Sequence, residues 1–126
     1  MEQDEMLHRL EDLVARDPRY KLESYVFVIN ALEYTMAKLE RSGHVSGTEL
    51  LEGVKEFARE RFGLMTKMVF EHWGISKTDD FGEIVFTLVN AGVLGKTETD
   101  SKEDFKNVYD FDEAFGEKCD WGTEEV

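Results

Sequence analysis

Hydrophobic residues recur along most of the chain at the three- and four-residue spacing of one helical face. Residues that start or stop helices divide this pattern into segments. The predicted helices cover residues 4–16, the stretch from Pro18 to a stop at Ser42-Gly43, Ser46 to Gly63, a short stretch ending at Gly74, and Thr78 to Gly92. The pattern therefore predicts a mainly α protein, folded as a compact domain of five or six helices.

Two local signals define the third of these helices. Ser46-Gly47-Thr48-Glu49 has the spacing of a capping box, in which the serine and glutamate side chains each accept the other's backbone N–H. Gly53 stands inside the same helix, where glycine is unfavourable. We take it to mark close helix packing, so Gly53→Leu should destabilise the fold.

Spacing also assigns caps and buried faces in other helices. Asp17 is placed to cap the second helix, with Pro18 at its first position. The apolar residues of the fourth helix are predicted to face inward; they are Met65, Met68, Val69 and Trp73.

The helical pattern breaks after residue 95, and two interpretations of the next stretch stay open. In the first, Lys96–Glu98 and Val108–Phe111 pair as a short C-terminal β-hairpin. In the second, Ser101 caps a sixth helix that carries Phe105, Val108 and Tyr109. Both place a single helical domain at residues 1–115, followed by a flexible acidic tail at residues 116–126.

With a hairpin, residues 46–112 would have the element order of a winged helix, a familiar DNA-binding shape. The helix that would enter the major groove, Asp79 to Ala91, carries three acids and neither lysine nor arginine. Direct DNA binding is therefore not expected, and a winged-helix-like scaffold would serve protein contacts instead.

Charge indicates what kind of partner to expect. The 126 residues include 28 acids and 15 bases, which gives a net charge of −13. Residues 96–126 hold 11 of these acids against four bases. Such a field repels phosphate backbones and favours a partner protein with a basic surface, although surplus charge also serves solubility.

Acids at the start of the predicted fifth helix are a first candidate interaction surface. Asp79, Asp80 and Glu83 could bind a metal ion together with His72. Acids in the first turn also complement the helix dipole, and that explains all three without any ion. No metal site is therefore assigned.

A second candidate surface combines aromatic and acidic residues. Tyr109, Asp110, Asp112 and Glu113 belong to a run that resembles a short docking motif for a basic groove. Alternatively, the aromatic residues of this run tuck into the body and the acids face solvent. Trp73 is the third candidate, because a tryptophan at a helix end lies at a core edge or a contact surface.

The sequence shows no catalytic or cofactor motif. The single cysteine, Cys119, excludes an internal disulfide and has no neighbouring histidine. Neither a phosphate-binding glycine loop nor a nucleophile elbow occurs, so no cofactor is expected. The longest apolar run, Tyr25–Ile29, is too short to span a membrane, and the acidic start does not read as a signal peptide. Together these features predict a cytoplasmic protein.

Five segments carry a likeness to a known family; they are Ala15–Tyr20, His44–Gly53, Trp73–Ile75, Asp80–Phe86 and Val108–Phe115. Together they resemble a family of small uncharacterised bacterial proteins restricted to the planctomycete and verrucomicrobial lineages. The resemblance spans residues 7–115 and implies a bacterial origin. It carries over no activity and no catalytic residue.

These features predict a non-enzymatic protein–protein interaction or regulatory module. Two alternatives stay open: a small-molecule-binding protein or enzyme with a pocket between helices, and an acidic mimic of nucleic acid that binds a basic protein. A pocket that gathers His72, Trp73 and several acids would favour the first alternative. Acids aligned along one face would favour the second.

Overall fold

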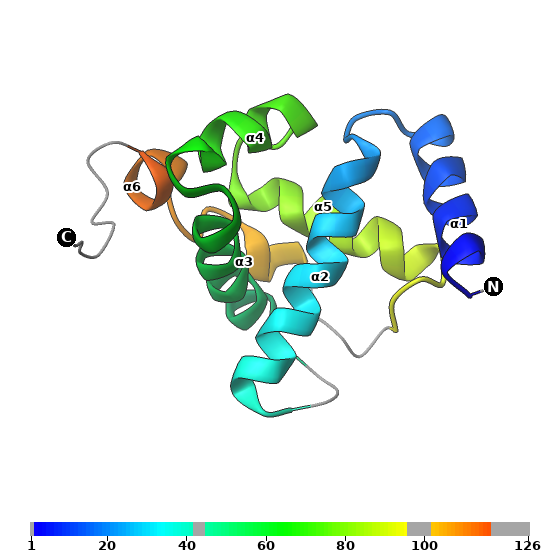
Figure 1. The fold of residues 1–126 in the computed structure, drawn as a ribbon, viewed down its shortest axis with the longest axis horizontal. Coiled ribbons are helices and arrows are strands. Elements are labelled where there is room, and N and C mark those ends of the chain that lie inside the picture. Colours follow the sequence, from blue (N-terminus) through cyan, green and yellow to red (C-terminus); the bar gives the residue numbers. More distant parts are fainter. Residues whose placement is uncertain (1, 42–44, 96–101, 117–126) are drawn as a thin grey trace.

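The computed structural model describes residues 2–41, 45–95 and 102–116, and these ranges are mainly helical (Figure 1). The helices are α1 (Glu2–Arg16), α2 (Leu22–Leu39), α3 (Gly47–Phe62), α4 (Thr66–Trp73), α5 (Thr78–Asn90) and α6 (Phe111–Phe115), with 3-10 turns η1 (Gly63–Met65) and η3 (Lys102–Phe105). The predicted mainly α class is therefore confirmed. None of the helices described is long and apolar enough to cross a membrane.

Helix α2 runs through the middle of the molecule. Helices α1 and α3 lie on its two sides, and α5 crosses behind it (Figure 1). The short helix α6 packs against α4, away from α1. Because neighbours cover α2 on several sides, its residues Tyr25, Val28 and Ala31 are fully buried.

Phe70 of α4 stands at the centre of an aromatic core. Its ring centroid lies 5.6 Å from that of Phe27 in α2, 5.3 Å from Phe81 in α5 and 5.4 Å from Phe115 in α6. Trp73, which is 9% exposed, closes one edge of this cluster at 6.0 Å from Phe70. One buried ring on α4 thus joins helices that are far apart in the sequence.

The buried face of α4 agrees only in part with the predicted one. Trp73 is buried and Val69 is partly buried, as predicted, whereas Met65 and Met68 are 56% and 62% exposed. Thr66 and Phe70 are buried in their place. A polar residue can occupy the buried position because the Thr66 hydroxyl donates to the carbonyl oxygen of Gly63 at 2.6 Å.

Helix α2 begins at Leu22 rather than at Pro18, which corrects the predicted cap. The Asp17 carboxylate instead accepts hydrogen bonds from Arg19: its Oδ1 accepts the backbone N–H at 3.3 Å and Nε at 2.9 Å, and its Oδ2 accepts Nη2 at 2.7 Å. The bound guanidinium holds the pKa of the Asp17 carboxyl below its usual value. This turn packs on Gly74, where φ is 92° and an added Cβ would lie 2.4 Å from the Arg19 carbonyl oxygen.

The chain after residue 101 corrects the predicted hairpin. The described ranges contain no strand, so neither the β-hairpin nor the winged-helix order of residues 46–112 is found. Residues 108–110 are irregular because Asp110 caps α6: its Oδ1 accepts the backbone N–H groups of Asp112 at 2.7 Å and Glu113 at 3.3 Å. Several predictions fall outside the described residues; they concern Ser42-Gly43, Lys96–Glu98, Ser101, Cys119 and the tail from residue 117.

A slot between α3 and α5 holds the buried ring of Phe105. Two glycines make room for it: an added Cβ on Gly47 would lie 3.0 Å from the ring, and one on Gly82 would lie 2.9 Å from the Phe105 Cβ. The hydroxyl of Thr78 donates to the Phe105 carbonyl at 2.7 Å and accepts the Val108 N–H at 3.0 Å. The segment around η3 is therefore fixed by both packing and hydrogen bonds.

Candidate binding site between α2 and α3

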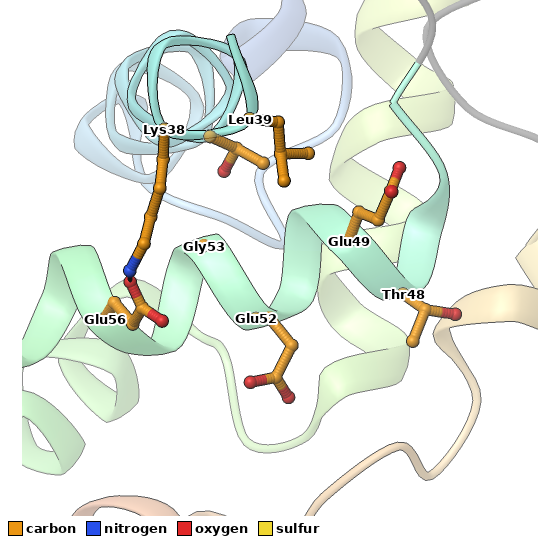
Figure 2. Close-up of a pocket in the computed structure, with 8 residues that line it drawn as sticks. Lys38, Leu39, Thr48, Glu49, Glu52, Gly53 and Glu56 are labelled. Carbon is orange, nitrogen blue, oxygen red and sulfur yellow. Dashed lines mark hydrogen bonds and ion pairs between the residues drawn. The ribbon is translucent and has the colours of Figure 1, made fainter. Parts of the chain in front are cut away.

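A pocket of about 300 Å³ opens between the C-terminal end of α2 and the N-terminal half of α3 (Figure 2). Its lining combines carboxylates with aliphatic surface. The lining residues are Thr35, Lys38 and Leu39 from α2, and Thr48, Glu49, Glu52, Gly53 and Glu56 from α3.

The floor of the pocket is set by a close contact between the two helices. A Cβ built on Gly53 would lie only 1.7 Å from Oγ1 of Thr35, so no other residue fits without a shift. Thr35 is buried, and its hydroxyl donates back to the carbonyl oxygen of Ala31 at 2.7 Å. This geometry confirms the close packing predicted at Gly53. Leu39 stands beside it as an apolar wall that is 38% exposed.

Three glutamates of α3 form the rim of the pocket. Glu49, Glu52 and Glu56 follow one another at spacings of three and four residues, which places them on one helical face over about 10 Å. The predicted capping box fixes the first of them: Ser46 N–H donates to Glu49 Oε1 at 3.0 Å, and Glu49 N–H donates to Ser46 Oγ at 3.1 Å. The Ser46 backbone and then Arg41 hold the pKa of Glu49 below its usual value, so this carboxylate is ionised at neutral pH.

Cations of the same chain already contact these acids. Lys38 of α2 forms an ion pair with Glu56, as Figure 2 shows, and Arg41, just beyond α2, forms one with Glu49. The third acid, Glu52, lies 3.4 Å from Lys55 Nζ on the same helix. The rim is thus a row of exposed ion pairs.

The chemistry of this lining is that of a binding site. Apolar surface beside carboxylates fits a group with an aliphatic stem and a positively charged end. The described lining residues include neither a histidine nor a cysteine.

The candidate residue Asp80 holds two parts of the fold together. Its Oδ1 accepts the hydroxyl of Tyr20 at 2.6 Å, and its Oδ2 accepts the backbone N–H of Ser76 at 2.8 Å. Burial and this hydrogen bond raise the pKa of Tyr20. Asp80 thus ties the turn before α2 to the start of α5.

The neighbouring candidates Asp79 and Glu83 also have partners within the chain. Asp79 Oδ1 accepts the backbone N–H of Asn107 at 2.9 Å. Glu83 lies 3.6 Å from Arg19 and 3.2 Å from Lys102. No group of three histidines, cysteines or acids among the described residues could hold a metal ion. These acids therefore attach neighbouring segments to α5.

The acidic run at residues 110–113 surrounds the start of α6. Asp110 is the N-cap, and Asp112 forms an ion pair with Lys67 of α4. Glu113 is exposed. The aromatic residues of this run are turned inward, since Phe111 and Phe115 are buried.

Tyr109 is likewise held by the body of the protein. Its hydroxyl donates to the carbonyl oxygen of Leu51 at 2.7 Å, and Lys55 Nζ lies 4.9 Å from the centre of its ring. Burial raises the pKa of Tyr109 far above its ordinary value. This residue connects α3 to the segment before α6.

Trp73 lines a second pocket, of about 240 Å³, on another part of the α2–α3 seam. That pocket is lined mainly by apolar side chains, including Val26, Phe57 and Phe62. Neither Trp73 nor His72 lines the pocket at Gly53. The pocket that is lined by several glutamates therefore contains neither of the two residues, His72 and Trp73, that would have favoured a small-molecule site.

No residue of the α2–α3 pocket was predicted as a site residue, although Gly53 was expected to mark close helix packing. The spacing of Glu49, Glu52 and Glu56 is a readable signal, because it places three acids on one face beside Gly53. The sequence does not reveal which helix lies against Gly53, and so it could not place Lys38 and Leu39 across from these acids.

No family model, curated protein or solved structure matches the chain. A functional assignment therefore rests on the residues and the geometry described above.

Proposed function

We propose that this chain is a protein-binding module whose α2–α3 pocket receives a basic, amphipathic segment of a partner protein. The observation that carries the proposal is the pairing of an apolar floor at Leu39 and Gly53 with a rim of carboxylates that includes Glu52 and Glu56. Lysine and arginine have an aliphatic stem and a charged end, so they match both parts of this surface.

Net charge supports the same kind of partner. A chain with a charge of −13 attracts basic segments and speeds their encounter. Exposed ion pairs are individually weak, so the rim selects cations while the apolar contact supplies much of the affinity. The partner segment should therefore carry both lysine or arginine and a large apolar side chain.

A labelled peptide of leucine and lysine, with its leucines on one helical face, serves as the probe. We expect Glu52→Gln/Glu56→Gln to weaken its binding about fivefold in fluorescence anisotropy, because two charges leave the rim. The matched control is Glu11→Gln/Asp12→Asn, which removes the same charge from exposed positions of α1, on the other side of α2. Equal effects of the two variants would show that only net charge matters and would refute the site.

The apolar half of the site has its own test. Leu39→Ser should weaken binding of the same probe several-fold because it removes apolar surface from the pocket. Leu7→Ser is the control, since Leu7 is 42% exposed on α1 and does not line the pocket. A loss of affinity in both variants, or in neither, would contradict the proposal.

The pocket volume favours one alternative function. About 300 Å³ is at the lower end of the range for small-molecule sites, and the lining suits an alkyl chain with a terminal amine. Binding of 1,8-diaminooctane distinguishes a small-ligand site from a peptide-binding site. An affinity equal to that of the leucine–lysine peptide would favour the small-ligand function. The alternative of nucleic-acid mimicry has less support, because the acids that share one face of α3 extend over only about 10 Å.

A further inference from the structure

Two cations of the chain occupy the places that a partner's cations would take. Lys38 pairs with Glu56 at one end of the row of acids, and Arg41 pairs with Glu49 at the other end. Both cations come from the α2 side and contact acids of α3. The Lys38–Glu56 pair spans the two walls of the pocket (Figure 2), and Arg41 reaches a lining acid from just outside the pocket.

The middle acid is bound differently. The only ion pair that the structure describes for Glu52 is with Lys55, three residues further along the same helix at 3.4 Å. Lys55 Nζ also lies 4.9 Å from the centre of the Tyr109 ring. No α2 cation therefore stands in front of Glu52.

The internal cations lower the free energy that a ligand gains when its own cation pairs with Glu49 or Glu56. When an incoming cation displaces Lys38 or Arg41, one exposed ion pair replaces another, and little is gained. The internal cations also compete at a fixed high local concentration, because the fold holds them beside their acids. The first cation of a ligand can gain at Glu52, whereas further cations must displace Lys38 or Arg41 and add little.

From this arrangement, and on the premise of the proposed function, we infer that Lys38 and Arg41 are specificity-determining residues of the pocket. They act as built-in competitors at the two ends of the row of acids, where a further cation of a ligand gains little. The pocket of the unchanged protein therefore gives little preference to a segment with several lysines or arginines over a segment with one.

The variant Lys38→Gln/Arg41→Gln tests this inference with two probes. One is the leucine–lysine peptide, and the other is the same peptide with all but one lysine replaced by glutamine. We expect the variant to bind the multi-lysine peptide about threefold to tenfold more tightly than the unchanged protein does, with a smaller gain for the single-lysine peptide, because only several cations can pair with the freed acids together. The discrimination between the two peptides therefore rises.

The matched control removes two cations away from the pocket. Arg16→Gln/Lys106→Gln makes the protein more acidic by the same amount, and neither residue lines the pocket. Equal gains in both double variants, or unchanged discrimination in Lys38→Gln/Arg41→Gln, would overturn the inference. The charge-preserving variant Lys38→Arg/Arg41→Lys should keep the discrimination of the unchanged protein.

Failure of this inference is distinguishable from failure of the proposed function. If Glu52→Gln/Glu56→Gln weakens binding and Lys38→Gln/Arg41→Gln leaves discrimination intact, the site stands and the role of the internal cations is refuted. If neither variant differs from its control, the site itself is refuted. Circular dichroism checks that each variant is folded, and Lys38→Gln alone should give part of the same effect.

Discussion

At the scale of single residues, Gly53 decides how closely α2 approaches α3. Its missing side chain leaves just enough room for the Thr35 hydroxyl, which bonds to its own helix. Helix propensity and packing predict opposite effects on stability when Gly53 is replaced by alanine. Alanine favours a helix over glycine by about 1 kcal/mol, whereas overpacking a core costs about 1 to 3 kcal/mol.

We therefore expect Gly53→Ala to lower the free energy of unfolding by about 1 to 2 kcal/mol, measured by urea denaturation followed by circular dichroism. The added Cβ meets Thr35 Oγ1 first, so the cost should shrink when Gly53→Ala is made in a Thr35→Ala background. A stabilised Gly53→Ala would mean that the helices are not in contact there.

At the scale of helices, periodicity predicted which segments are helical better than it predicted their faces. The helix predicted from Thr78 begins at that residue, and Ser46 caps α3 as expected, because both signals are local. In α4 the choice of face depends on how Thr66 satisfies its hydroxyl in the folded chain, which spacing cannot show.

The segment around η3 was harder still to predict, since its shape depends on a slot built by two other helices. Phe105 fits between Gly47 and Gly82 only after α3 and α5 have come together. For α6 a local signal was present: Asp110 is followed three residues later by Glu113.

Phe105→Ala should destabilise the protein by about 3 to 5 kcal/mol, because it empties the slot between α3 and α5. Hydrogen exchange should report the same loss locally, since the N–H groups of Asn107 and Val108 are held by Asp79 and Thr78. Met68→Ala is the comparison, and we expect it to change stability by less than about 0.5 kcal/mol because Met68 is exposed. Unchanged protection at residues 107 and 108 in Phe105→Ala would contradict this role.

At the scale of the whole molecule, all four tyrosines share one property. Burial is the first cause that raises the pKa of each of them, and it raises that of Tyr34 to about 12 together with a hydrogen bond to Glu60. A pKa that is higher in the folded chain than in the unfolded chain stabilises the fold below the unfolded value, and this stability is lost as the pH rises toward the folded value.

We therefore expect stability to fall as the pH rises above about 10, the ordinary pKa of tyrosine. Absorbance of tyrosinate should show little ionisation in the folded protein near pH 10, while the urea-unfolded chain ionises there. Tyr34→Phe should remove the ionisation near pH 12. A folded protein in which a tyrosine titrates at its ordinary pKa would contradict the burial of these side chains.

The candidate site also belongs to this scale. Composition predicted a basic partner, which remains a prediction, but the pocket itself exists only because the end of α2 lies across α3. The acids singled out from the sequence have mainly structural roles, since they attach neighbouring segments to α5. A local charge pattern shows neither these attachments nor which acids line a pocket.

The aromatic core has a consequence for how the protein is made. Phe70 is fully enclosed only when Phe111 and Phe115 have joined it, and the slot between α3 and α5 stays empty until Phe105 arrives. A growing chain emerges from the ribosome in the order of its sequence, so the earlier helices expose these apolar surfaces while the later residues are still being added. During that interval the nascent chain is more prone to aggregate than the completed protein.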